Sequence, residues 1–148
     1  MFVAHSMGGI VARRYLVANL VNLIDVNTVF GLLLVASPSL GSEVANTLDL
    51  MNRLLYGNTQ LKALQFSADN TWLTTLDQDF MKLKDSCRLT IIGKELVEQE
   101  SIPLQKHLLQ SAPIVPWFSA NRYFDSVRIP YSDHMSICKP TEKAAEQH

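Results

Sequence analysis

The stretch AHSMGG (residues 4–9) constrains the fold of this chain more than any other feature. The short apolar run FVAH (2–5) predicts a buried strand, and after Gly8 apolar residues recur at helical spacing. A strand that turns so sharply into a helix strains the backbone of the residue at the tip and needs small residues two positions before and after it. Ala4 and Gly8 meet that requirement, so we expect Ser6 at the tip with its hydroxyl exposed above a sheet.

Composition fits an ordinary globular domain and excludes several classes of protein. The chain has 148 residues, of which 47% are hydrophobic and 18% charged, and its net charge is −1. This charge gives no electrostatic case for binding nucleic acid or an anionic membrane surface. No apolar run approaches the roughly 20 residues of a membrane span, and no signal peptide is visible. The compartment stays open, with the cytoplasm as the default.

Further apolar runs predict a sheet. Their lengths and flanking turns favour strands, at residues 29–38, 87–93, 112–118 and 126–130. The charged segment KELVEQE (94–100) reads as a loop. Because strands alternate with helical stretches, we expect an α/β fold with a mostly parallel sheet flanked by helices.

The region between the second and third strands has a different character. Short amphipathic helices are expected over residues 46–84, either as a helical cap or lid or as ordinary helices packed on the sheet, and the second interpretation is favoured. The tail at 141–148 is polar and expected to fray. Residues 1–148 are therefore interpreted as one domain.

The tip of the predicted turn has the residue pattern of a nucleophile. Small-x-Ser-x-Gly is a variant of the Gly-x-Ser-x-Gly elbow, in which the serine hydroxyl attacks a carbonyl. A serine there lies at a helix N-terminus, where backbone N–H groups favour developing negative charge. The N–H of Met7 would point at the oxyanion. The alternative is that Ser6 merely caps the helix.

The chain resembles the α/β-hydrolase family, in particular its lipase and esterase members. The resemblance is carried by AHSMGG followed by IVARRYL (10–16), by WFSANRYF (117–124) and by SDHMSICKP (132–140). The last two segments are similar to a branch of serine esterases that includes the glycosylphosphatidylinositol inositol-deacylase. The resemblance implies a serine hydrolase that cleaves carboxylic, lipid-like esters with a Ser-His-acid triad and without a cofactor.

His134 is the predicted general base. It follows the strand at 126–130 in a short polar loop, the place of the base in the order Ser, acid, His. An imidazole, with its ordinary pKa of about 6.5, suits proton transfer near neutrality. His107 reads as an ordinary surface residue and His148 as a mobile terminus. His5 should point away from Ser6, since neighbouring strand residues face opposite ways, and is given a packing or hydrogen-bonding role.

The acid that orients the base is less constrained. Glu95 is the first choice, because the strand, Gly93 and the following acid resemble the family's arrangement. Glu98, Glu100 and Asp125 remain alternatives.

Other polar residues receive lesser roles. Asp133 is expected to shape its loop, because it adjoins the base too closely to orient it. Arg13 and Arg14 are expected to be solvated, and Cys87 and Cys138 to be buried thiols rather than a disulfide.

A serine-containing turn follows the strand at 29–38. Its three serines, interpreted as a pocket wall or as a simple turn, are Ser37, Ser39 and Ser42.

The sheet looks incomplete at the sequence level. In the resembled family the elbow strand is central, and an earlier strand supplies the second oxyanion N–H. We therefore expect the chain to correspond to the C-terminal portion of such a domain and to fold poorly alone. No metal-ligand spacing is visible. A non-catalytic hydrolase-like module, or an acyltransferase, thioesterase or amidase, remain alternatives. Substrate and oligomeric state stay open.

Overall fold

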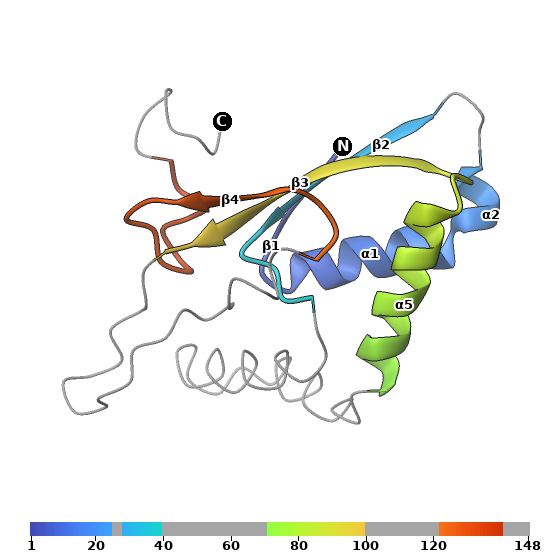
Figure 1. Ribbon diagram of the computed structural model, residues 1–148, viewed down its shortest axis with the longest axis horizontal. Coiled ribbons are helices and arrows are strands. Elements are labelled where there is room, and N and C mark those ends of the chain that lie inside the picture. Colours follow the sequence, from blue (N-terminus) through green and yellow to red (C-terminus); the bar gives the residue numbers. More distant parts are fainter. Residues whose placement is uncertain (25–27, 40–70, 100–121, 141–148) are drawn as a thin grey trace.

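The computed structural model describes residues 1–24, 28–39, 71–99 and 122–140. In chain order the elements are β1 (Phe2–His5), α1 (Gly8–Ala18), α2 (Leu20–Leu23), β2 (Val29–Val35), α5 (Thr71–Asp85), β3 (Thr90–Glu98) and β4 (Ser126–Ile129) (Figure 1). Among these residues no helix is long and apolar enough to cross a bilayer.

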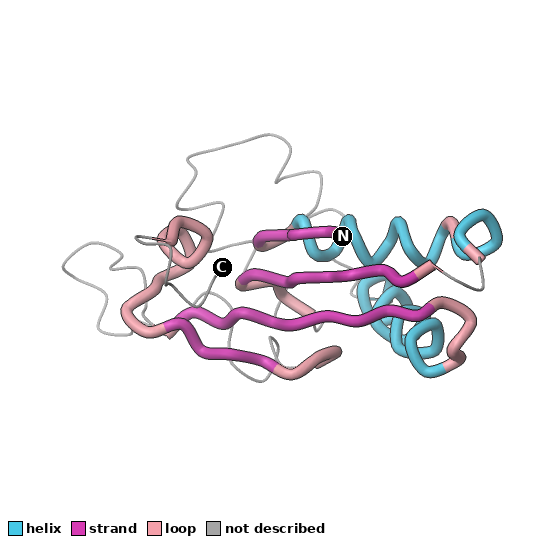
Figure 2. Tube along the Cα trace, turned by 90° about the horizontal axis from the view of Figure 1, so that it is seen from above, coloured by secondary structure: helices cyan, strands magenta, loops and turns pink. Residues whose placement is uncertain are grey.

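The strands form a single parallel sheet in the order β1-β2-β3-β4 (Figure 2). Ala4 pairs with Leu34, and Leu34 pairs with Glu95. At the far side, Glu95 pairs with Ser126. The fold is therefore of the α/β type, as predicted. Since every strand runs the same way, all four carboxyl ends lie at one edge of the sheet.

One face of the sheet, here called the helix face, carries α1 and α5 (Figure 1). Strand alternation sends Ala4, Leu32 and Leu34 to this face, where they meet helix side chains. The buried helix residues in this cluster are Ala12, Leu16, Phe80 and Leu83. The part of the 46–84 region that is described, α5, is thus a helix packed on the sheet and on α1, and residues 46–70 lie outside the described residues.

On the opposite face, here called the open face, the described residues cover the sheet toward the carboxyl ends of the strands. There, Ile137 from the turn after β4 packs on Val35, Leu96 and Ile129. Toward the amino ends, large apolar side chains face solvent: Val3 is 62% exposed, Val29 55% and Ile92 60%. In the described part of the chain β1 has a pairing partner on one side alone, so Val3 lies on a strand whose other side is unpaired.

Two sequence predictions differ from the structure at β3 and the cysteines. The strand was expected to end at Gly93, but it continues through Glu98, because β2 pairs along its first part and β4 along its last. The segment read as a charged loop is therefore mostly strand. Cys87 and Cys138 are free and exposed rather than buried, because each lies in a turn whose neighbours do not fold over it. The expected strand at 112–118 and the tail at 141–148 lie outside the described residues.

Candidate active site

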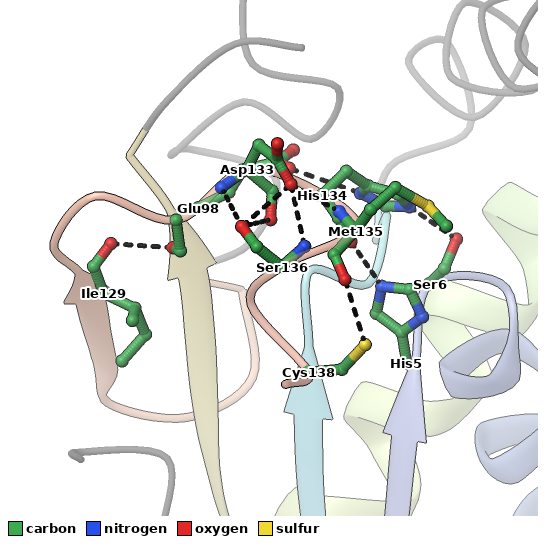
Figure 3. A network of polar contacts seen from close by, with 10 residues as sticks. His5, Ser6, Glu98, Ile129, Asp133, His134, Met135, Ser136 and Cys138 are labelled. Atoms are coloured by element: carbon green, nitrogen blue, oxygen red, sulfur yellow. Dashed lines mark hydrogen bonds and ion pairs between the residues drawn. The ribbon is translucent and has the colours of Figure 1, made fainter. Parts of the chain in front are cut away.

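Three strand ends bring one serine, one histidine and one glutamate together (Figure 3). Ser6 follows β1, Glu98 ends β3, and His134 lies in the turn after β4. Although Ser6 and His134 are 128 residues apart in sequence, Ser6 Oγ lies 3.0 Å from His134 Nε2. The parallel sheet explains this proximity, because carboxyl ends that are distant in sequence share one edge.

The turn at Ser6 has the strained geometry expected of an elbow. Its φ is 54°, in the left-handed region that costs an ordinary residue about 1–2 kcal/mol. The Ser6 N–H donates to Val35 O at 2.9 Å, so the strained residue is tied to β2.

The steric constraint falls on a different glycine than expected. A Cβ on Gly8 would lie 3.7 Å from that of Ala4, an ordinary contact. A Cβ on Gly9 would lie 2.0 Å from Ser37 Oγ and 2.9 Å from a methyl of Leu34. Gly9 is thus the residue that lets α1 approach the end of β2.

Ser6 itself is covered. It is 5% exposed, so the expectation of a hydroxyl standing open above the sheet is wrong. Met7 is the N-cap residue of α1. Backbone N–H groups before the first full helical turn have no intrahelical acceptor, which keeps the proposed oxyanion role for Met7 N–H geometrically open.

His134 is fully enclosed and has a neighbour on each ring nitrogen. Its side chain is 1% exposed, and that of Glu98 is 0% exposed. Glu98 Oε2 lies 3.3 Å from Nδ1, within ion-pair distance of a protonated imidazole, although the two atoms do not meet in hydrogen-bond geometry. A carboxylate there favours the tautomer with hydrogen on Nδ1, which leaves Nε2 free to accept the Ser6 proton.

Glu98, not Glu95, therefore lies beside the predicted base. The two residues are three apart in one strand, so alternation sends them to opposite faces. Glu95 points to the helix face, where its Oε1 accepts the N–H groups of Tyr123 at 2.6 Å and Phe124 at 3.0 Å. Burial raises the pKa of Glu95 from 4.5 to about 6. Glu95 thus fixes the segment leading into β4, and its selection as the acid does not fit this geometry.

The turn that carries His134 is built by its own hydrogen bonds. Asp133 Oδ1 accepts the N–H groups of Met135 at 2.9 Å and Ser136 at 2.7 Å. The hydrogen bond from the Ser136 N–H is the largest of the causes that lower the pKa of Asp133. Ser132 Oγ donates to Ile129 O at 2.7 Å, tying the turn to β4. The prediction that Asp133 shapes its loop is confirmed.

His5 makes the hydrogen bond that the sequence left open. Its Nε2 lies 2.8 Å from the carbonyl oxygen of His134, and the two rings lie 4.9 Å apart, tilted by 42°. The hydrogen-bonding role predicted for His5 is confirmed.

Arg13 is buried rather than solvated, at 1% exposure. It donates to Gly9 O at 3.1 Å, to Pro38 O at 2.8 Å and to the hydroxyl of Tyr123. The Tyr123 hydroxyl in turn donates to Asp77 Oδ1 at 2.8 Å. The first turn of α1, the end of β2, α5 and the segment before β4 are joined by this network.

An ion pair on α5 completes the network. Arg122 binds both carboxylate oxygens of Asp77, at 3.1 and 2.8 Å. Burial acts to raise the pKa of Asp77, but the hydrogen bonds from Arg122 and Tyr123 outweigh it and lower that pKa. Arg14, by contrast, is exposed as predicted.

The remaining candidates are Asp125, the serines that follow β2, and residues outside the described part of the chain. Asp125 is exposed, whereas Ser37 and Ser39 are buried where β2 ends, next to the start of α1. Outside the described residues lie Glu100, His107, His148 and Ser42. Within residues 1–24, 28–39, 71–99 and 122–140, no group of three or more His, Cys, Asp or Glu side chains could hold a metal ion.

Comparisons with protein-family models, with curated proteins and with solved structures found no match to this chain. The interpretation of the site therefore depends on its geometry. Two of its features had a sequence signal that the prediction passed over. The apolar pair Leu96–Val97 indicates that β3 continues to Glu98, and Arg13 lies four residues after Gly9 and three before Leu16, on the buried face of α1.

Proposed function

We propose that this protein is a serine hydrolase of the α/β-hydrolase type that cleaves carboxylic esters. The observation that carries the proposal is that His134 lies between the other two residues. Its Nε2 is 3.0 Å from Ser6 Oγ, and its Nδ1 is 3.3 Å from Glu98 Oε2. A nucleophile within reach of a base, and a base next to a carboxylate, is the arrangement that activates a serine hydroxyl. The expected preference for lipid-like esters is supported by the sequence resemblance alone.

The proposed reaction has two halves. Ser6 Oγ forms a bond to the ester carbonyl carbon while its proton passes to His134 Nε2, and the carbonyl electrons move to the oxygen near Met7 N–H. The tetrahedral intermediate then expels the alkoxy group, which takes the proton from His134 and leaves as an alcohol. Water attacks the acyl-serine by the same route, releasing the acid and restoring Ser6. Glu98 would stabilise the imidazolium in both halves.

Fluorophosphonate labelling tests the nucleophile directly. We expect the protein to be labelled at Ser6, located by peptide mass spectrometry, and Ser6→Ala to abolish labelling. Ser37→Ala is the matched control, because Ser37 is a buried serine following the neighbouring strand. Labelling that persists in Ser6→Ala, or that is lost equally in Ser37→Ala, would contradict the proposal. Because Ser6 is 5% exposed, the labelling rate also measures how readily the site opens.

A panel of substrates separates the related activities. Esters, thioesters and amides with the same acyl group would share Ser6 and His134, so the ratio of their kcat/KM values decides between esterase, thioesterase and amidase. We expect the ester to be preferred. A folded protein that turns over none of them and resists the probe would instead favour the non-catalytic module.

A further inference from the structure

His5 is a polar group next to the site that the proposed reaction does not use. It is the last residue of β1 and directly precedes Ser6. Its Nε2 lies 2.8 Å from the backbone oxygen of His134. A carbonyl oxygen only accepts hydrogen bonds, so Nε2 must carry the hydrogen and donate it.

Two consecutive residues thereby hold the same histidine by different groups. Ser6 meets the His134 imidazole at 3.0 Å, while His5 holds the His134 backbone. This is possible because β1 ends at His5, and Ser6 lies in the left-handed turn that directly follows the strand. The contact fixes the turn after β4 to the very strand that bears the nucleophile, so the base and the nucleophile share one support.

The other hydrogen bonds that support the turn after β4 do not join it to β1. The hydrogen bonds of Asp133 and Ser136 stay within the turn, and that of Ser132 reaches β4. The Gln99 N–H donates to Ser132 O at 3.0 Å and ties the turn to β3. Besides the Ser6–His134 contact, the turn is joined to β1 by the His5 hydrogen bond and by the contact between the His5 and His134 rings.

We propose that His5 is a positioning residue for the base: its Nε2–H holds the backbone of His134 so that the imidazole stays between Ser6 and Glu98. The expected effect of His5 on kcat rests on the proposed function, whereas its hold on the backbone of His134 does not. Misplacing a catalytic group by about 1 Å can cost roughly 10²-fold in rate, which makes such a support consequential.

The charge state of His5 is compatible with this role. The charged groups acting on it are His134 in the turn and Glu98 at the end of β3. Burial, the largest cause, lowers the pKa of His5 below its usual 6.5. His5 is then neutral at pH 7, where it donates through Nε2–H without placing a second positive charge beside an imidazolium on His134.

The matched pair His5→Gln and His5→Asn tests the inference. Both carry an amide N–H donor, but Gln reaches about as far as Nε2 and Asn is one methylene shorter. Tyr131→Phe, in the same turn and 90% exposed, is the control. The assays are kcat and KM with a short-chain nitrophenyl ester, the rate of fluorophosphonate labelling, and thermal unfolding.

We expect His5→Asn to lower kcat and the labelling rate about 10- to 100-fold with little change in KM. His5→Gln should recover most of that loss, and Tyr131→Phe should match the unchanged protein. Wild-type rates in His5→Asn would overturn the inference. So would a His5→Gln variant as slow as His5→Asn while unfolding at the wild-type temperature.

A second measurement keeps the inference independent of activity. In proton NMR, the Nδ1–H of His134 next to Glu98 should give a low-field signal protected from exchange, and His5→Asn should broaden or remove it while His5→Gln keeps it. An unchanged signal in His5→Asn overturns the inference, whether or not the protein hydrolyses esters. Failure of the unmodified protein to label at Ser6 would sink the proposed function alone.

Discussion

A substitution at Glu95 gives the sharpest test of whether Glu95 is structural while Glu98 serves the proposed chemistry. Its carboxylate is 1% exposed on the helix face and accepts two backbone N–H groups from the segment before β4. Glu95→Gln keeps an acceptor oxygen at nearly the same place but removes the titration. The substitution therefore isolates the effect of the charge from the effect of the hydrogen bonds.

The size of the expected stability change follows from the shift in the pKa of Glu95. Burial raises the pKa of Glu95 from 4.5 to about 6, so between these values the folded state binds more protons than the unfolded state. Stability contributed by Glu95 is then fully present below about pH 4.5 and is lost as pH rises through about 6. A shift of roughly 1.5 pH units corresponds to about 2 kcal/mol of unfolding free energy, since each unit is worth about 1.4 kcal/mol. Because the side chain is buried, solvent screening does not reduce this figure much.

The assay is urea unfolding, followed by circular dichroism, at several pH values between 4.5 and 7.5. His5, whose pKa is lowered by burial, changes stability in the opposite direction over part of this range, so the quantity of interest is the difference between the unmodified protein and Glu95→Gln. We expect that difference to shift by about 2 kcal/mol in favour of the variant as pH rises. A difference that is constant with pH, or that shifts in favour of the unmodified protein, would refute the assignment of Glu95 to a buried structural site.

Three further outcomes are expected. Glu98→Gln should reduce kcat by up to about 10⁴-fold while Glu95→Gln at pH 7 changes it little, and equal losses in a steady-state ester assay would contradict the choice of Glu98. Gly9→Ala should destabilise the fold by about 1–3 kcal/mol in urea unfolding while Gly8→Ala stays near neutral, because only a Cβ on Gly9 would collide with its neighbours; the reverse order would contradict the packing. Ile92→Thr, at a position 60% exposed, should reduce binding of a hydrophobic dye while changing stability by less than about 0.5 kcal/mol, and unchanged dye binding would show that the open face is covered in solution.

Much of the fold was accessible from patterns of apolar residues. The runs that became β1, β2 and β4 were located within a few residues, and their alternation with helical segments predicted a parallel sheet. Beyond Gly93 the local signal for β3 is limited to the apolar pair Leu96–Val97, and the charged residues on both sides of that pair favour a loop instead. Pairing with β4 on one side and β2 on the other holds that half in the sheet, and a local pattern does not contain those partners.

The residues of the candidate site likewise differ in how much local sequence signal they leave. The sequence predicted Ser6 and His134, which lie side by side in the structure, because a strained turn and a polar loop after the last strand each leave a local signature. The choice between Glu95 and Glu98 depends on which face of β3 each one occupies, and that depends on where the strand ends. Likewise, the burial of Arg13 depends on acceptors that lie far away in sequence, Pro38 O and the Tyr123 hydroxyl.

Alternation along β3 also explains how one strand serves both stability and the proposed chemistry. Glu95 faces α1 and α5, where it anchors the segment that leads into β4. Glu98, on the other face, meets the turn that follows β4. The first contact fixes where β4 begins, and the second places a carboxylate where the chain returns after it. A change in the register of β4 against β3 would disturb both contacts together, so the pairing of these two strands couples the anchor at Glu95 to the contact between Glu98 and His134.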